Sequence, residues 1–149
     1  MGELILMRIT QEADNAFRVV LHLAGLPEGE RCTARSISEV MSISVQFTLK
    51  TLNKLTKRGI TCAYRGVNGG YALNKAAADI TMRDIIEVVD GPIAINRCLL
   101  EKKNCNQNIA DKCVVNTALA GVQKVLIDAL EAVNMQQLLI EQQKMEQAS

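Results

Sequence analysis

The sequence predicts a mainly α-helical fold with one small β-wing, and three observations support this expectation. Apolar residues recur at helical spacing in 11–25 and 45–58, a glycine-rich turn at 66–70 separates two short β-prone runs, and no proline interrupts 114–149. The chain has 149 residues, of which 48% are hydrophobic and only 3% aromatic. We therefore expect one domain, or one small domain plus an appendage, with an aliphatic core.

Three helices are expected before residue 60. The first, over 11–25, ends at Gly25, and its apolar face comprises Ala13, Phe17, Val20, Leu21 and Ala24. A short helix at 36–41 is followed by a break at 42–44, where Ser44 should be the N-cap of a third helix over 45–58. The residues of this third helix that we expect to face inward are Val45, Leu49, Leu52 and Leu55.

A hairpin and two further helical regions complete the predicted elements. Residues 60–65 and 71–73 should be the strands of the hairpin, and Thr81 should cap a helix over 82–90 that ends before Pro92. The C-terminal region is predicted to be one long helix with a heptad-like stripe suited to packing on another helix: Val115, Leu119, Val122, Leu126, Ala129 and Val133.

The charge of the chain is unevenly distributed. The net charge is only +1, yet residues 31–75, here called the basic module, hold eight basic residues and one acidic residue, a net charge of +7. The remainder carries nine basic and fifteen acidic residues, a net charge of −6. A basic module of this kind indicates an anion-binding surface, most commonly for nucleic acid, although a solvated basic face is an alternative.

The order of the elements in and around the basic module is that of a winged helix-turn-helix. The second helix of such a pair enters the major groove, and a basic residue on the hairpin can enter a minor groove. Gln46 can pair with adenine, whereas Lys50 can reach guanine or phosphate. The residues predicted to contact double-stranded DNA are Ser44, Gln46, Thr48, Lys50, Lys54, Arg65 and Asn68.

Three of the five cysteines lie in one polar stretch, with the spacing Cys98-x6-Cys105-x7-Cys113. Thiolates are soft ligands that iron–sulfur clusters and zinc both favour, and the absence of a Cys-x-x-Cys pair counts against a zinc knuckle. The alternative is three free thiols in a loop. We interpret Cys32 and Cys62 as structural, and His22 as a packed side chain rather than a ligand.

Four stretches of the chain carry a family resemblance: Met7-Arg-Ile-Thr10, Leu55-Thr-Lys-Arg-Gly59-Ile, Arg65-Gly-Val-Asn-Gly-Gly-Tyr-Ala-Leu73 and Asp79-Ile-Thr-Met-Arg-Asp-Ile-Ile-Glu-Val-Val-Asp-Gly-Pro92. They resemble the Rrf-type winged-helix regulators, the group that contains IscR, NsrR, RirA and CymR. The resemblance implies a homodimer on a palindromic operator. It divides the chain into a DNA-binding domain at 7–80, a linking helix and cysteine-rich loop at 81–113, and a dimerisation helix at 114–149. Met7 would be the natural start, with 1–6 a short extension.

The resemblance also implies an iron–sulfur cluster, [4Fe–4S] or [2Fe–2S], held by Cys98, Cys105 and Cys113. One branch of the family has a His where this chain has Asn116, and another has a Glu and a His where it has Asp14 and Arg18. The nitric-oxide-sensing branch uses an Asp of the first helix, donated across the dimer, and Asp14 matches that position. Asp14 is thus the expected fourth ligand, and the alternatives are Glu12 and Asp111.

The function predicted from these features is that of a cytoplasmic repressor whose operator affinity depends on a cluster that senses nitric oxide, redox state or iron–sulfur status. The alternative is a cluster-free regulator of the same family that responds through a partner protein or thiol oxidation. With one His and no convergent acid–base pair, we predict no enzyme. No apolar run is long enough for a membrane helix, and the N-terminus lacks the features of a secretory signal.

Overall fold

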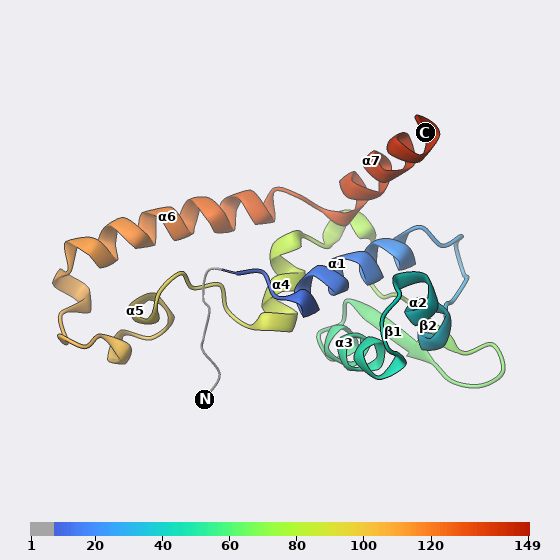
Figure 1. Cartoon of the computed structure of the whole chain (residues 1–149), viewed down its shortest axis with the longest axis horizontal. Coiled ribbons are helices and arrows are strands. Elements are labelled where there is room, and N and C mark those ends of the chain that lie inside the picture. The colour runs from blue at the N-terminus through green and yellow to red at the C-terminus, as the bar shows by residue number, and fades with distance from the viewer. Residues whose placement is uncertain (1–7) are drawn as a thin grey trace.

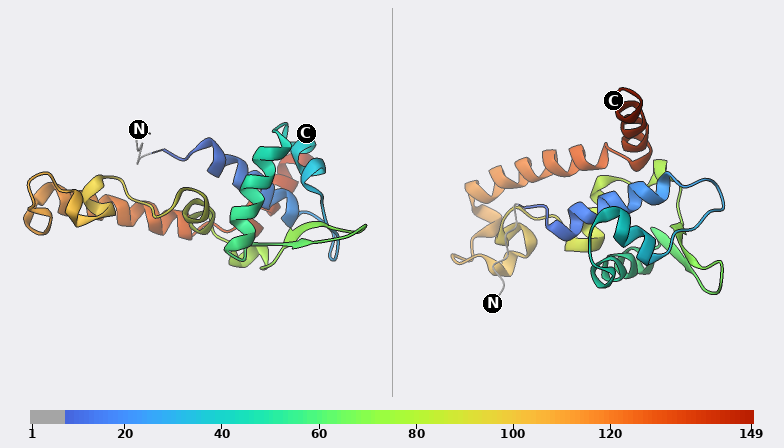
Figure 2. Two further views of the ribbon diagram at one scale, coloured as in Figure 1. Left: turned by 90° about the horizontal axis from the view of Figure 1, so that it is seen from below. Right: turned by 45° about the vertical axis from the view of Figure 1, so that its right-hand side comes forward.

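The computed structural model describes residues 8–149, and the expectations for the first seven residues fall outside this range. The helices and the β-hairpin between residues 11 and 90 gather at one end of the molecule (Figure 1). After residue 90 the chain runs outward through residues 97–113 and turns back along the helix Val114–Glu131. It then returns to the first group, where the helix Met135–Gln147 lies beside the helix Gln11–Ala24 (Figures 1 and 2). The predicted fold class, mainly helical with a small wing, is confirmed.

Helix α1 (Gln11–Ala24) begins where predicted, because the Thr10 hydroxyl accepts a hydrogen bond from the Ala13 N–H at 3.1 Å. The predicted buried face was only partly correct. Phe17, Leu21 and Ala24 lie half-exposed on its flank. The positions that enter the core follow the helical period more closely, and they are Ala13, Ala16, Val19, Val20 and Leu23.

Helices α2 (Ala34–Met41) and α3 (Val45–Lys57) form the predicted pair. Ser42 ends α2 in the left-handed conformation, with φ of 55°, and the Ser44 hydroxyl caps α3 by accepting from the Phe47 N–H at 3.1 Å. The inward face of α3 was predicted incorrectly at its N-terminal end, because Val45 and Leu49 are each 38% exposed. The residues that α3 buries are Thr48, Thr51, Leu52 and Leu55.

The wing consists of strands β1 (Thr61–Tyr64) and β2 (Gly70–Leu73), paired antiparallel with Thr61 opposite Leu73 and Tyr64 opposite Gly70. The backbone of Cys32 adds a bridge to Tyr71 on the other edge of β2. Gly70 is required here, because its φ is 143° and a Cβ atom would lie 2.9 Å from the Cys32 carbonyl oxygen. The loop before α2 is thereby attached to the wing.

A short 3₁₀ turn, η1 (Ala77–Asp79), leads into α4 (Met82–Asp90), which starts with a reciprocal capping box between Thr81 and Asp84. The cysteine segment, residues 97–113, follows. It contains α5 (Arg97–Leu100) and two 3₁₀ turns, η2 (Lys102–Asn104) and η3 (Ala110–Lys112). This segment lies at the end of the molecule opposite the wing (Figures 1 and 2).

The single long C-terminal helix predicted for 114–149 is wrong: the structure has two, α6 (Val114–Glu131) and α7 (Met135–Gln147). The break arises because the backbone of 133–135 pairs with that of 80–82, through hydrogen bonds from the Met82 N–H to the Val133 oxygen and from the Met135 N–H to the Ile80 oxygen, each 2.9 Å long. This pairing places the Met135 side chain, which is 0% exposed, in the core. Within residues 8–149, no helix combines the length and apolarity needed to cross a membrane.

Candidate nucleic-acid interface and cysteine segment

The exposed face of α3 is the first part of the candidate interface. It carries Gln46, Leu49, Lys50, Asn53 and Lys57, which recur at intervals of three or four residues. Gln46 and Lys50 therefore lie on the predicted face. Leu49 and Asn53 were missed, although the helical period that includes Gln46 and Lys50 would have identified them. The hydroxyl of Ser44 is used by the cap at the start of this face.

Thr48, which the sequence predicted to contact DNA, faces the core instead. Its side chain is 0% exposed, and its hydroxyl donates a hydrogen bond to the Ser44 carbonyl oxygen at 3.0 Å. A position four residues after the N-cap lies on the same side as the buried Leu52 and Leu55, so Thr48 cannot reach a groove. Its side chain stabilises the first turn of α3.

Lys54, also predicted to contact DNA, is held between helices. Its ammonium group lies 2.9 Å from Glu12 of α1 and donates to the Val89 carbonyl oxygen at 3.0 Å. Its side chain is 34% exposed, against 59% for Lys50. Lys54 thus joins α3 to the start of α1 and the end of α4. No sequence signal could reveal these contacts, because the partners lie 42 and 35 positions away.

The wing supplies the second part of the interface. Arg65 and Asn68 are exposed in its turn, together with Val67, which is fully exposed. Arg31, which the sequence did not single out beyond its charge, donates to the Asn68 carbonyl oxygen at 3.1 Å, and its guanidinium lies over the Tyr64 ring. Arg31 therefore adds a positive charge beside the turn and connects it to the loop before α2.

The two cysteines of the basic module have local partners. Cys32 is buried, and its Sγ lies 3.6 Å from the Nε2 atom of His22. Cys62 lies on β1, where its Sγ contacts the Tyr64 hydroxyl at 3.4 Å. These contacts support the interpretation of both cysteines as structural and of His22 as packed.

In the cysteine segment, Cys98, Cys105 and Cys113 are all free and half-buried. Desolvation raises the pKa of Cys98, and a hydrogen bond with Cys105 and the charges of Cys105 and Cys113 raise it further. Backbone N–H groups of Ile109 and Gln107 hold the pKa of Cys105 below its ordinary value. Cys105 and Cys113 therefore both lie near enough to Cys98 to influence the pKa of its thiol.

The fourth candidate ligand does not join the three thiols within one chain. Asp14 forms an ion pair with Arg18 at 3.3 Å, and no three His, Cys, Asp or Glu side chains between residues 8 and 149 converge on one metal position. The two alternatives to Asp14 are also paired. Glu12 binds Lys50 and Lys54, and Asp111 binds Lys102.

The donor type of the segment fits an iron–sulfur cluster, because such clusters are held by cysteine thiolates. Three thiols are available within one segment, and none forms a disulfide. Asn116, three residues after Cys113, donates to the Ala110 carbonyl oxygen at 3.2 Å, while its own amide oxygen is buried without a hydrogen-bond partner. The first turn of α6, directly after the segment, therefore holds one uncommitted oxygen donor.

Comparison with known proteins identifies the family. Residues 9–141 match the family model described as Rrf2, iron-dependent transcriptional regulator. The chain belongs to the Rrf2 family. It is therefore a DNA-binding transcriptional regulator and not an enzyme, which confirms these two predictions.

Several solved structures share the fold of this chain. The global cysteine regulator CymR of B. subtilis is 20% identical, with a TM-score of 0.71 and coverage of 91% of this chain and 98% of that one. IscR of T. potens gives 20% identity and a TM-score of 0.71 over 91% and 88% of the two chains. The oxidized form of Staphylococcus aureus CymR gives 19% identity and a TM-score of 0.69 over 89% and 96%. At these identities the likeness shows the shared fold alone.

Proposed function

We propose that this Rrf2-family regulator is a homodimeric repressor whose affinity for a palindromic operator depends on an iron–sulfur cluster held by the cysteine segment. The proposal depends on one observation: three free thiols lie in one segment, and that segment leads directly into α6. Cys113, the last of the three, is the N-cap residue of that helix. The family description, an iron-dependent regulator, favours the same conclusion.

The DNA contacts proposed for each protomer come from α3 and the wing. Gln46 and Lys50 project from the exposed face of α3, where Gln46 can pair with adenine and Lys50 can reach guanine or phosphate. Ser44 is exposed at the start of α3, where its hydroxyl accepts from the Phe47 N–H as the cap and can donate to a phosphate. Arg65 and Asn68 lie in the wing turn, where Arg65 can enter a minor groove.

The homodimer is proposed from the exposure of α6. This 18-residue helix has no buried residue in the single chain. Its exposed apolar side chains are Val114, Val115, Val122, Val125 and Leu126. Apolar surface on this scale favours burial against another helix, and a second copy of α6 offers a complementary one. Dimerisation would also provide the two DNA-binding surfaces that a palindrome requires.

Cys98, Cys105 and Cys113 would hold the cluster, with Asp14 of the partner subunit as the fourth ligand. A bound cluster would supply iron that reacts with nitric oxide or oxidants, and an oxygen ligand would be more readily exchanged than a thiolate. The residues of this chain would transmit the change. Cys98 follows the end of α4, and Cys113 precedes α6, so ligation of both constrains the segment between the DNA-binding part and the dimer helix.

Anaerobic purification tests this proposal, with iron and acid-labile sulfide measured per chain before and after nitric oxide. We expect visible absorbance from a cluster, its loss in the Cys98→Ala, Cys105→Ala and Cys113→Ala variants, and its retention in Cys62→Ala as the matched control. Protein that holds no iron or sulfide even after reconstitution would contradict the proposal.

Two free thiols that act on each other's pKa, Cys98 and Cys105, favour a second candidate function, a thiol switch without a cluster. Hydrogen peroxide would accept two electrons from these two thiols; the S–S bond would form as the O–O bond breaks, and the two thiol protons would leave in two water molecules. The oxidized form of Staphylococcus aureus CymR is a structure of similar fold. In this case Cys98→Ala and Cys105→Ala would abolish the response of DNA binding to peroxide, whereas Cys113→Ala would leave it unchanged.

A further inference from the structure

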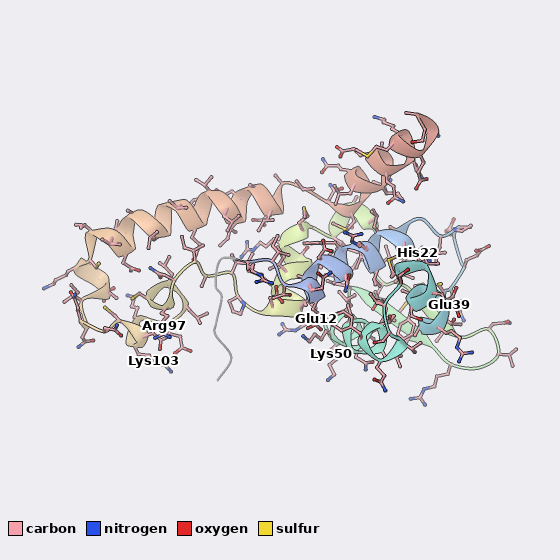
Figure 3. The ribbon with its side chains drawn as sticks, viewed as in Figure 1. Glu12, His22, Glu39, Lys50, Arg97 and Lys103 are labelled. Carbon is pink, nitrogen blue, oxygen red and sulfur yellow. The ribbon has the colours of Figure 1, made fainter. Side chains whose placement is uncertain are left out.

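The carboxylate of Glu12 binds two lysines of α3 from the first turn of α1. Its oxygens lie 2.9 Å from the ammonium group of Lys54 and 3.3 Å from that of Lys50, and its own side chain is only 14% exposed. Figure 3 shows Glu12 and Lys50 facing each other at the side of the molecule where α3 lies. Glu12 thus places a shielded negative charge beside the helix proposed to enter the DNA groove.

The two lysines are held unequally. Lys54 has a second partner, the Val89 carbonyl oxygen at 3.0 Å, and is partly buried. Lys50 has Glu12 as its one ion-pair partner among residues 8–149, at the longer distance, and its side chain is 59% exposed. If Lys50 moves away, the Glu12 carboxylate therefore stays where it is, because Lys54 still neutralises its charge.

DNA phosphates and Glu12 offer Lys50 the same kind of partner. An ion pair with an exposed lysine is weak and screened by salt, whereas the high charge density of the duplex favours release of counterions when a lysine contacts phosphate. We propose that Glu12 is an intramolecular counter-ion that competes with DNA phosphate for Lys50 and so lowers the affinity of the free regulator for DNA. Glu12 acts as a positioning residue through Lys50. The inference rests on the proposed role of α3 in DNA binding.

The proposed effect depends on the negative charge of the Glu12 carboxylate. When the Glu12 carboxylate is replaced by the neutral amide of Gln, Lys54 keeps its bond to Val89, and Lys50 is free to contact phosphate. Any carboxylate in the basic module repels DNA to some degree. The control must therefore remove an equal charge that does not pair with Lys50. Glu39, exposed on α2 and labelled in Figure 3, is the one acidic residue of the basic module and makes no ion pair within the described part of the chain.

The experiment measures binding of a fluorescent 40-base-pair duplex of mixed sequence by fluorescence anisotropy over a series of KCl concentrations. The proteins compared are the unsubstituted chain and the variants E12Q, E39Q, K50A, E12Q/K50A and E39Q/K50A. We expect E12Q to bind DNA roughly threefold to tenfold more tightly at low salt. The slope of the logarithm of its association constant against log [KCl] should become steeper by about 0.9 for each Lys50 that gains a phosphate contact. E39Q should shift affinity less and leave this slope nearly unchanged.

The double variants separate pairing from general electrostatics. The loss of affinity caused by K50A should be larger in the E12Q background than in the unsubstituted chain, and it should not change in the E39Q background. Circular dichroism melts establish that each variant is folded. E12D, which retains the charge on a shorter side chain, is measured in parallel and should lie between the unsubstituted chain and E12Q, so the test does not depend on the stability of one variant.

Two outcomes would overturn the inference, and they are distinguishable. In the first, the unsubstituted chain binds DNA, but E12Q and E39Q change the affinity and the salt slope by the same amount, or K50A has the same effect in every background. Glu12 then does not compete with DNA for Lys50. If the unsubstituted chain binds no duplex at low salt, the proposed role of α3 fails, and the inference fails with it.

Discussion

The guanidinium of Arg31 lies over the ring of Tyr64, with its carbon 3.5 Å from the ring centroid. The same guanidinium donates to the Asn68 carbonyl oxygen, so one side chain connects the loop before α2 to both β1 and the wing turn. A cation over an aromatic face is attracted by the ring quadrupole, and Arg is well suited to stack and donate at the same time. This contact fixes the wing turn against the loop before α2.

Replacing Tyr64 by Leu should therefore weaken DNA binding without changing its dependence on salt. The substitution removes the stacking partner and leaves every positive charge in place, so we expect roughly a twofold to fivefold loss of affinity and an unchanged slope against log [KCl]. Arg31→Ala should both weaken binding and flatten the slope. An equal slope for the two variants, measured by anisotropy, would show that Arg31 acts only through the wing and not through its charge.

Alanine substitutions at Gln46 and Thr48 should have different effects, although both residues were predicted to contact DNA. One should change sequence recognition and the other the stability of the fold. Gln46 is exposed, so Gln46→Ala should reduce discrimination between sequences by about 1–3 kcal/mol and leave unfolding unchanged. Thr48 is buried and hydrogen-bonded, so Thr48→Ala should lower the free energy of unfolding by about 1–2 kcal/mol. Sequence selection from a random duplex library and urea denaturation measure the two effects, and a reversed pattern would contradict the orientation of α3.

Met135 and Met145 provide a matched pair on α7. Met135 is 0% exposed in the core, whereas Met145 is 70% exposed. Met135→Ala should lower the free energy of unfolding by about 2–5 kcal/mol, because it leaves a cavity where α7 packs against α1. Met145→Ala should change it by less than about 0.5 kcal/mol. Equal effects in urea denaturation would mean that α7 does not dock in this way.

The stripe on α6 should control oligomeric state. Val122 is 59% exposed in the single chain, and a charge buried at that position in a dimer would lack a partner. We expect Val122→Glu to convert the dimer to monomer, as measured by light scattering during size-exclusion chromatography, and to weaken operator binding. Thr117→Glu, on an exposed position outside the stripe, is the control and should remain dimeric. A dimer that survives Val122→Glu would place the interface elsewhere.

Asp14 and Asn116 offer two oxygen donors for the fourth position of the proposed cluster. If Asp14 of the partner subunit is the ligand, Asp14→Ala should accelerate loss of iron to a chelator, whereas Asn116→Ala should not. If the buried amide oxygen of Asn116 is the ligand instead, the order of the two rates should reverse. Iron release is followed by absorbance under anaerobic conditions, so the measurement does not depend on DNA binding.

Local interactions explain what could be predicted from the sequence. The cap residues Thr10, Ser44 and Thr81 each accept a hydrogen bond from a residue three positions later, and the glycines around 66–70 allow the turn of the wing. These features involve neighbours in the chain, so composition and spacing are sufficient to identify them. The uneven charge distribution is likewise a property of sequence position, and the order of elements with that charge indicated a DNA-binding fold.

The tertiary structure decided how these elements use their side chains. Lys54 and Lys50 are equivalent in the sequence, yet Lys54 is held by Glu12 and Val89, whereas the Lys50 side chain is mostly exposed. The difference arises because the start of α1 and the end of α4 pack against only one side of α3. The heptad-like stripe predicted one helix, but pairing of residues 133–135 with 80–82 breaks it and buries Met135. The sequence by itself determined the family, the caps and the charge asymmetry. Packing between distant segments determined that Lys50 remains exposed and Lys54 does not, because the partners of Lys54 lie more than thirty positions away.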